Sequence, residues 1–327
     1  MKILHVLLTR MPIPPKDYGG TERVLWALYK GQTELGHEVR FLTKANPSNV
    51  PYIQVYDKSK PIEAQIDDWA DIVHFHWPYD GDLHKPYICT EHSNAEYTKE
   101  YPINSVFLSS KHAENHGARC YVHNGLYWGD YGDPNFKPKN YVHFLAKAAW
   151  YVKNLQGAVK VARAAHVHLE VLGGKRISIR RNPYFYISRD VNFNGMVGGE
   201  RKNQLVRNSK GLIFPVLWHE PFGLAIIESM YLGCPVFASP FGSLPDIVSH
   251  DGLGILSDSY SDLAEAVKQI DKYDRRLCHE HAKTHFGHQA MSKAYLECYE
   301  RVMAGESLNE FRPICKGNVK AQLSMRY

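Results

Sequence analysis

Two carboxylates in one segment are the strongest chemical feature of this sequence. Glu220 and Glu228 are separated by seven residues in LWHEPFGLAIIESMYLGCPVFASPFGSLPDIV, residues 217–248. The Pro-Phe-Gly that follows Glu220 breaks the chain, so we predict a helix from Leu224 with Glu228 on its first turns. Carboxylates accept hydrogen bonds from vicinal hydroxyl groups. The backbone amides at the start of this helix, those of Phe222, Gly223 and Leu224, can donate hydrogen bonds to hydroxyl groups or to phosphate. Spacing alone leaves another interpretation open, with Glu220 as a surface cap and Glu228 as a solvated helix residue.

Two strand–helix junctions add residues that can bind an anion. Lys147 and Lys153 flank the loop after the first expected strand of the second half, where two ammonium groups can hold a diphosphate. Gly19 and Gly20 lie before the first expected helix, where backbone N–H groups can approach an anion. Plainer interpretations are solvated surface lysines and a loop in which Thr21 caps the helix.

Histidines follow two expected strands. His74 and His76 are two residues apart on a strand at 71–76, so they share one face. A metal pair would need a third ligand, and no acidic or cysteine residue has matching spacing, so polar residues at a strand end are favoured. His92 follows a strand at 87–90 and is expected in the same crevice, where ligands bind in open α/β sheets. A lone histidine is more often structural, so the residue type alone does not assign it a function.

The elements that must position these residues alternate between strand and helix. Helices are expected at 21–35, 155–165 and 273–303. Strands are expected at 2–9, 38–43, 71–76, 87–90, 105–109, 141–145, 168–172, 191–193, 211–215 and 235–238. Strands that are apolar on both faces predict an α/β protein with parallel sheets covered by helices. We place a linker at 130–140, which is rich in Pro, Gly, Asp and Lys, and the length of 327 residues predicts about two domains. The tail 304–327 is left unassigned.

Composition narrows the class of protein. Hydrophobic residues make up 44% and charged residues 22%, with a mean hydropathy of -0.39, which excludes disorder throughout the chain. The N-terminus is expected to be a strand rather than a signal peptide, and no run approaches the ~18–20 apolar residues of a membrane span.

The net charge of +5 is spread along the sequence without a nucleic-acid motif, so no nucleic-acid partner is expected. Six scattered cysteines predict a reduced, cytoplasmic protein. Trp26, Tyr29 and Lys30 leave a peripheral membrane contact open, although an amphipathic core helix explains them better.

Taken together, these residues resemble the retaining nucleotide-sugar glycosyltransferases of family 4. The resemblance rests on GGTERVLWALYKGQTELGHEV at 19–39, on the E-x7-E segment, and on GCPVFASPFGSLPDIV after it. Asn124-Gly125 and the LEVLGG of 169–174 fall between them in the family's order. The resemblance implies the GT-B fold: two Rossmann-like parallel-sheet domains facing a cleft, with the C-terminal helix crossing back to the first. It implies an acceptor-side domain at 1–137, joined by 290–327, and a donor domain at 138–289.

The resemblance also implies roles for the candidate residues. Glu228 should bind the ribose hydroxyls, and Glu220 the hydroxyls of the transferred sugar, joined by the amides of Phe222, Gly223 and Leu224. Lys147 and Lys153 should neutralise the diphosphate, where fixed cations stabilise the departing leaving group. Gly20, beside Gly19, should offer its N–H to the phosphate, and His92 matches the family's active-site histidine. Three departures stand out: Ala146-Lys147 replaces Gly-Arg, Lys153-Asn154 replaces Lys-Gly, and Leu126-Tyr127 replaces the acidic residue that often follows Asn-Gly.

The activity implied is hexose transfer with retention of configuration. The donor would be a nucleoside diphosphate sugar, with UDP favoured over GDP, and the acceptor a glycan or lipid-linked molecule in polysaccharide or glycoconjugate biosynthesis. The donor is a substrate, and no cofactor or divalent metal is expected. A cytoplasmic protein is expected, with placement at the inner face of the membrane left open. Other classes also stay open: a nucleotide-sugar binding protein whose catalysis has decayed, suggested by the departures, and an epimerase or phosphorylase of the same fold.

Overall fold

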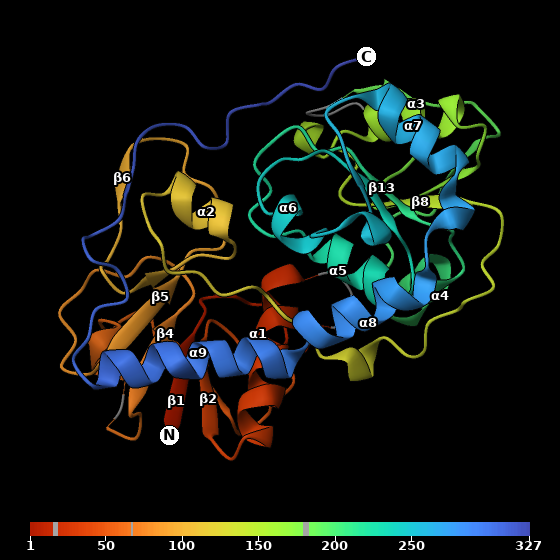
Figure 1. Ribbon diagram of the computed structural model, residues 1–327. Helices are drawn as coiled ribbons and strands as arrows, with labels where there is room; N and C mark the ends of the chain where they lie inside the picture. Colours follow the sequence, from red (N-terminus) through yellow and green to blue (C-terminus); the bar gives the residue numbers. More distant parts are fainter. Residues whose placement is uncertain (16–18, 67, 179–182) are drawn as a thin grey trace. The chain divides into compact units, whose positions relative to one another are not determined.

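The chain folds into two compact units (Figure 1). The computed structural model describes residues 1–15, 19–66, 68–178 and 183–327. The first unit comprises Met1–Tyr127 with Phe286–Val319, and the second comprises Trp128–His285 with Lys320–Tyr327. The first unit therefore ends ten residues before the predicted domain boundary at 137, and the second unit's main segment ends four residues before the predicted boundary at 289. The last eight residues belong to the second unit rather than the first.

The first unit is built on a parallel six-stranded sheet. Its strand order is β3-β2-β1-β4-β5-β7. The strands are β1 (Lys2–Val6), β2 (Glu38–Thr43), β3 (Ile53–Val55), β4 (Ile72–Phe75), β5 (Tyr87–Thr90) and β7 (Ser105–Val106). Ile3, Phe41 and Val73 are fully buried on these strands, as a sheet covered on both faces requires.

Helices α1 (Gly20–Glu34) and α9 (His288–Met303) pack against each other in this unit. Gly31 lies at their contact, where a Cβ atom would lie 2.3 Å from Ser292 Oγ and 2.7 Å from the His288 carbonyl oxygen. A glycine is therefore needed for the helices to approach this closely. The C-terminal helix thus packs on the first unit, as predicted.

The long helix predicted at 273–303 is wrong in one respect: it is two helices. Helix α8 (Arg275–His285) ends before Phe286, and α9 begins at His288. The break is made by a tertiary contact, because Leu126 donates to the Phe286 carbonyl oxygen at 3.0 Å and accepts from the His288 amide at 3.0 Å. Gly125 permits this approach, since a Cβ atom there would lie 2.5 Å from the Gly287 carbonyl oxygen.

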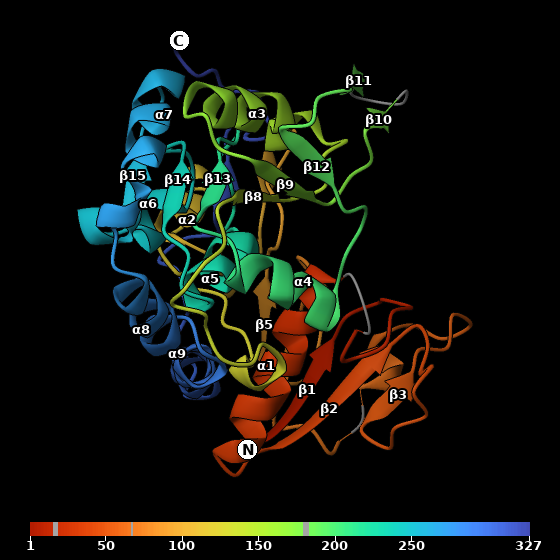
Figure 2. The same ribbon diagram turned by 90° about the vertical axis from the view of Figure 1, so that its right-hand side faces the viewer.

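The second unit has its own parallel six-stranded sheet, in the order β12-β9-β8-β13-β14-β15. The strands are β8 (Val142–Leu145), β9 (Leu169–Leu172), β12 (Val191–Phe193), β13 (Leu212–Phe214), β14 (Val236–Ala238) and β15 (Gly254–Leu256). Figure 2 shows α3 (Leu155–Ala164) and α7 (Tyr260–Lys268) on one face, and α4 (Gly199–Arg207) and α5 (Leu224–Tyr231) on the other. Apolar side chains of α3 and α7 fill the core against the sheet.

Several shorter elements complete the two units. They are α2 (Ser110–Asn115), α6 (Leu244–Ile247), the antiparallel strand pair β10 (Ile177–Ser178) and β11 (Tyr184–Phe185), and 3-10 turns at Glu63–Gln65, Trp128–Asp130, Tyr151–Lys153, Asp251–Leu253 and Ile270–Lys272. In the tail, β16 (Ile314–Cys315) pairs antiparallel with β6 (Lys99–Glu100) of the first unit. Leu323 donates to the Leu217 carbonyl oxygen at 2.7 Å in the second unit. Within the described residues, no helix is long and apolar enough to span a membrane.

Candidate functional site

The loop that carries Glu220 is held by a second loop of the same unit. Glu220 follows β13 and pairs with Gly242 in an isolated β-bridge, and Ser243 donates its amide to the Glu220 carbonyl oxygen at 2.9 Å. Gly242 has φ 69°, and a Cβ atom there would lie 2.3 Å from the Glu220 nitrogen. Only glycine fits this position without strain. Gly242 and Ser243 were missed as positioning residues, although Phe-Gly-Ser after an apolar strand indicates a tight loop.

The Glu220 carboxylate lies in a compact ionic cluster. Lys153 Nζ lies 2.5 Å from Glu220 Oε2, and Trp218 Nε1 donates to the same oxygen at 2.8 Å. The Lys153 ammonium also lies 4.9 Å from the centre of the Trp218 ring. Glu220 is 6% exposed, so it is not a surface cap. The structure therefore brings together two predicted site residues and one, Trp218, that the sequence analysis did not single out.

Lys153 is positioned by the left-handed residue that follows it. Asn154 has φ 56° and ψ 52°, and its Oδ1 accepts from the Gly157 amide at 2.9 Å as the cap of α3. Its Nδ2 donates to the Pro215 carbonyl oxygen at 2.7 Å. Asparagine is one of the residues that tolerate this conformation. The departure from Lys-Gly to Lys-Asn therefore keeps the backbone turn that a glycine would allow.

Lys147 lies on the same loop but is more exposed than Lys153. Its Nζ is 5.6 Å from the centre of the Trp150 ring. Gly173 packs against this loop, because a Cβ atom there would lie 2.0 Å from the Ala146 carbonyl oxygen. The turn after β9 therefore fixes the backbone beside Lys147.

Glu228 is the most enclosed of the predicted site residues. It is 2% exposed, so the interpretation as a solvated helix residue is wrong. Tyr131 donates to its Oε1 at 2.9 Å, and Lys202 Nζ lies 3.0 Å from its Oε2. Lys202, on the polar helix α4, is itself 6% exposed. Tyr131 and Lys202 were missed because they lie 97 and 26 residues from Glu228 and belong to no local motif.

Helix α5 begins at Leu224, as predicted. Gly223 precedes it with φ 90° and ψ 64°, in the left-handed region, and Phe222 is buried at 2% exposure. Ser243 Oγ donates to the Phe222 carbonyl oxygen at 2.5 Å, which ties this start to the loop after β14. The first-turn amides of a helix have no acceptor within it, so this terminus favours an anion or hydroxyl group.

In the first unit, the glycine pair stands at the start of α1. Gly19 caps the helix and Gly20 is its first residue. A Cβ atom on Gly19 would lie 2.9 Å from Met11 Cε, at the end of a flexible side chain, and 3.0 Å from Pro15 Cβ, so the loop packs closely around this glycine. Glu22 accepts a hydrogen bond from Thr9 Oγ1 at 2.7 Å, which joins the helix to the chain after β1.

The predicted histidines belong to a larger cluster in this unit. His74 and His76 stack with ring centres 4.1 Å apart, so they share a face as predicted. His76 Nδ1 lies 3.0 Å from His92 Nε2. A third histidine, His5 of β1, was missed, and ligand atoms of His5, His74 and His76 all lie within 4.8 Å of one another. Desolvation lowers the pKa of His5 and of His92 to about 4 and the pKa values of His74 and His76 well below the ordinary value.

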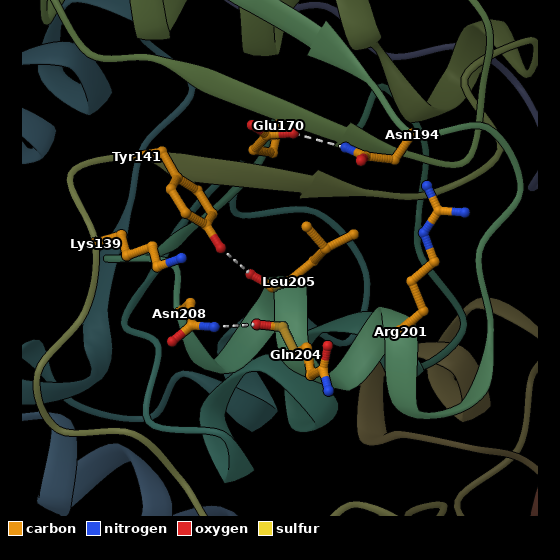
Figure 3. A pocket seen from close by; sticks show the side chains of 8 residues that line it. All are labelled: Lys139, Tyr141, Glu170, Asn194, Arg201, Gln204, Leu205 and Asn208. Atoms are coloured by element: carbon orange, nitrogen blue, oxygen red, sulfur yellow. Dashed lines mark hydrogen bonds between the residues drawn. The ribbon is translucent and has the colours of Figure 1, made fainter.

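A separate polar pocket of about 510 Å³ lies in the second unit (Figure 3). Its lining side chains come from β9, from α4 and from the segments beside β8, β12 and α4: Lys139, Tyr141, Glu170, Asn194, Arg201, Gln204, Leu205 and Asn208. Several of these are bonded within the wall, such as Asn194 Nδ2 to Glu170 Oε2 at 2.6 Å. None of the predicted site residues lines it.

The second unit matches a known family. Residues 133–283 match the family model described as glycosyl transferases group 1. An uncharacterized protein from the cps region of Klebsiella pneumoniae is 30% identical over 96 residues, which is 27% of this chain and 26% of that protein. An uncharacterized glycosyltransferase of Methanocaldococcus jannaschii is 33% identical over 69 residues, or 21% of this chain and 17% of that one. The chain thus spans about a quarter or less of the curated relatives it matches.

Solved structures share the fold over most of the chain. AviGT4, a glycosyltransferase involved in avilamycin A biosynthesis, has a TM-score of 0.76 at 21% identity, covering 93% of this chain and 98% of that chain. Anabaena HepE in complex with UDP and glucose has a TM-score of 0.65 at 14% identity, covering 91% and 98%. WaaG, a glycosyltransferase involved in lipopolysaccharide biosynthesis, has a TM-score of 0.60 at 14% identity, covering 93% and 100%.

These likenesses confirm the predicted GT-B fold, with a parallel six-stranded sheet and flanking helices in each unit. Residues 133–283 of the second unit resemble the group 1 glycosyl transferases, and the prediction of a transferase is confirmed at that level. Glu220, Lys153, Lys147 and Glu228 all lie within this matched segment.

Proposed function

We propose that the chain transfers a hexose from a nucleoside diphosphate sugar to a glycan or lipid-linked acceptor. The observation that carries the proposal is the Lys153–Glu220–Trp218 cluster, which stands beside the start of α5 inside the segment that matches the group 1 family. A buried carboxylate paired with an ammonium group, next to the start of a helix, suits a ligand that carries both hydroxyl groups and phosphate.

In this proposal the lysines stabilise the leaving diphosphate. Departure of the nucleoside diphosphate leaves negative charge on its phosphates and positive charge on the sugar, so fixed ammonium groups lower the barrier. Lys153 would exchange its bond to Glu220 for the diphosphate, and the Glu220 carboxylate would then accept the sugar hydroxyls. Lys147 would add a second positive charge, and the amides of Gly223 and Leu224 would join Glu220.

Glu228 is proposed to receive the ribose hydroxyls. A carboxylate has about four acceptor positions, and Tyr131 and Lys202 occupy two of those on Glu228. Because the residue is 2% exposed, a bound ribose requires the Lys202 ammonium or the Tyr131 hydroxyl to move. UDP is the favoured nucleotide, which the likeness to Anabaena HepE in complex with UDP supports.

The remaining assignments rest on the resemblance to family 4. The first unit would serve the acceptor, with Gly19 and Gly20 offering amides to the phosphate and His92 standing beside the transferred sugar. Configuration would be retained by attack on the face that the leaving phosphate vacates, without a divalent metal. The departures at Lys147 and Asn154 favour the alternative of a protein that binds nucleotide sugars without catalysis. The left-handed backbone of Asn154 removes one of these two reasons, and Lys147 still supplies a positive charge, so an active enzyme is the better hypothesis.

An assay of transfer and of slow donor hydrolysis with UDP- and GDP-sugars tests this proposal. We expect Glu220→Gln to lower the rate by about 100-fold or more, because the neutral amide accepts from fewer hydroxyls and releases Lys153. Glu265→Gln on the exposed surface of α7 is the matched control and should leave the rate unchanged. Equal rates in the two variants would contradict the assignment of Glu220.

A further inference from the structure

Three histidines of the first unit form a hydrogen-bonded chain that ends at His92. Gln32 Oε1 lies 2.8 Å from His5 Nε2, His5 Nδ1 lies 3.1 Å from His76 Nε2, and His76 Nδ1 lies 3.0 Å from His92 Nε2. His5 is 0% and His76 5% exposed, so no bulk water competes for these nitrogens. Both ring nitrogens of His5 and of His76 are therefore used inside the chain.

In such a chain of neutral imidazoles, the position of the proton on one ring determines its position on the next. Desolvation keeps the pKa of His5 at about 4 and that of His76 well below its usual range, so both rings are neutral near pH 7. A neutral imidazole has one donor nitrogen and one acceptor nitrogen. The ring nitrogen of His5 that carries the proton therefore determines which nitrogen of His76 is the donor, and this in turn determines the donor nitrogen of His92.

The Gln32 amide stands at the start of the chain and makes that choice. Its Nε2 donates to the Tyr299 hydroxyl at 3.2 Å, which turns Oε1 toward His5. The Tyr299 oxygen in turn lies 2.8 Å from His74 Nδ1. An amide oxygen only accepts, so His5 carries its proton on Nε2 and offers the lone pair of Nδ1 to His76.

We propose that Gln32 is a positioning residue that fixes the tautomer of His92 through His5 and His76. In this arrangement Nε2 of His92 carries the proton and donates to His76, and Nδ1 presents a lone pair. His92 then accepts a hydrogen bond from a hydroxyl group of its ligand rather than donating one. This last step rests on the proposed function, in which the ligand beside His92 is the transferred hexose.

The same cluster invites a metal interpretation, which the contacts disfavour. His5, His74 and His76 have ligand atoms within 4.8 Å of one another. Both ring nitrogens of His74 are nevertheless engaged, Nδ1 with Tyr299 at 2.8 Å and Nε2 with Thr90 Oγ1 at 2.7 Å. A metal ion would have to break these buried bonds, whereas the hydrogen-bonded chain leaves every one of them in place.

Nitrogen NMR of the full chain labelled at histidine tests the tautomer directly and needs no substrate. The His92 signals are assigned by their loss in His92→Gln. We expect a protonated Nε2 and an unprotonated Nδ1 for His92 in the wild-type protein near pH 7. Gln32→Met keeps the volume but removes the amide, and we expect it to give a mixture of the two His92 tautomers.

Thr43→Val is the matched control, since it removes a buried hydroxyl group of the same unit that donates to the Ala45 carbonyl oxygen at 2.7 Å and is not bonded to the chain. We expect it to leave the His92 tautomer unchanged. A protonated Nδ1 in the wild type, or a Gln32→Met protein with an unchanged tautomer, would overturn the proposal. Zinc that raises the melting temperature of the wild type but not of His74→Asn would overturn it as well.

Activity gives the second readout. In Gln32→Met we expect kcat to fall by about three- to tenfold, the worth of one hydrogen bond, with the KM for the donor little changed. Failure of the proposed function would appear as a wild-type protein without transfer activity, whatever its NMR result. Failure of the Gln32 proposal would appear as an active wild-type protein in which the His92 tautomer is the same with and without the Gln32→Met substitution.

Discussion

Glu228 carries its charge in a site almost closed to solvent, with Lys202 as its partner at 3.0 Å. Removing one member of a buried ion pair leaves the other charge without compensation and costs about 3–5 kcal/mol. We therefore expect Lys202→Met to lower the unfolding free energy of the second unit by about that amount, as measured by urea denaturation.

The control for this variant is Lys210→Met. Lys210 pairs with an exposed Asp271 at 2.9 Å, and surface pairs contribute about 0–1 kcal/mol. Similar small losses in both variants would mean that the Lys202–Glu228 pair adds no stability.

Residue types and local spacing predict only part of the site. Glu220 and Lys153 could be singled out because each lies beside a recognisable break between a strand and a helix. Lys202, Tyr131 and His5 could not, because their importance comes from partners supplied by distant parts of the chain.

At the scale of the elements, the contact of α1 with α9 depends on Gly31. A Cβ atom at this position meets the backbone oxygen of His288 as well as Ser292, so no side-chain rotation makes room for it. We expect Gly31→Ala to lower the unfolding free energy of the first unit by about 1–3 kcal/mol, the usual cost of overpacking, despite the better helix propensity of alanine.

Urea unfolding of three proteins checks this expectation. Ser292→Ala added to Gly31→Ala should recover only part of the loss, because the His288 carbonyl oxygen remains in the way. Glu38→Gln at an exposed position of β2 should change stability by less than about 0.5 kcal/mol. A Gly31→Ala protein as stable as the wild type would contradict the close contact.

Most strands of the two sheets were predictable from sequence because buried parallel strands are short apolar runs, and β2, β5 and β12 have the predicted bounds. The edge strands β3 and β15 were not predicted. The break between α8 and α9 was not, because helical periodicity continues on both sides of Gly287 and the interruption comes from its pairing with Leu126. Helix α4 was missed for a related reason: it has few apolar residues and buries Lys202 and Asn203 instead.

For the whole molecule, buried histidines predict loss of stability in mild acid. Desolvation holds the pKa of His5 at about 4 in the folded protein, against about 6.5 in the unfolded chain. Below pH 6.5 the unfolded chain therefore binds a proton that the folded protein does not, and stability falls as the pH drops toward 4. His5 alone accounts for about 3 kcal/mol over this interval.

The stability of the second unit should depend on pH in the same way, because burial lowers the pKa of His143 to about 3. Urea unfolding between pH 8 and pH 4.5 measures the effect. We expect no contribution from these two histidines above pH 7 and a steady fall in the unfolding free energy of both units below about pH 6.5. Constant stability down to pH 4.5 would show that these imidazoles are not buried as neutral rings.

The central claim is that the second unit holds a nucleoside diphosphate on Lys153 and its neighbours, and calorimetric titration with UDP tests it most directly. We predict that the wild-type chain binds UDP and that Lys153→Met weakens binding at least about tenfold, because a charged hydrogen bond to phosphate is lost. Lys283→Met, an exposed lysine of α8, should bind as the wild type does. Equal affinity in the two variants, or a wild-type protein that binds neither UDP nor GDP, would contradict the claim.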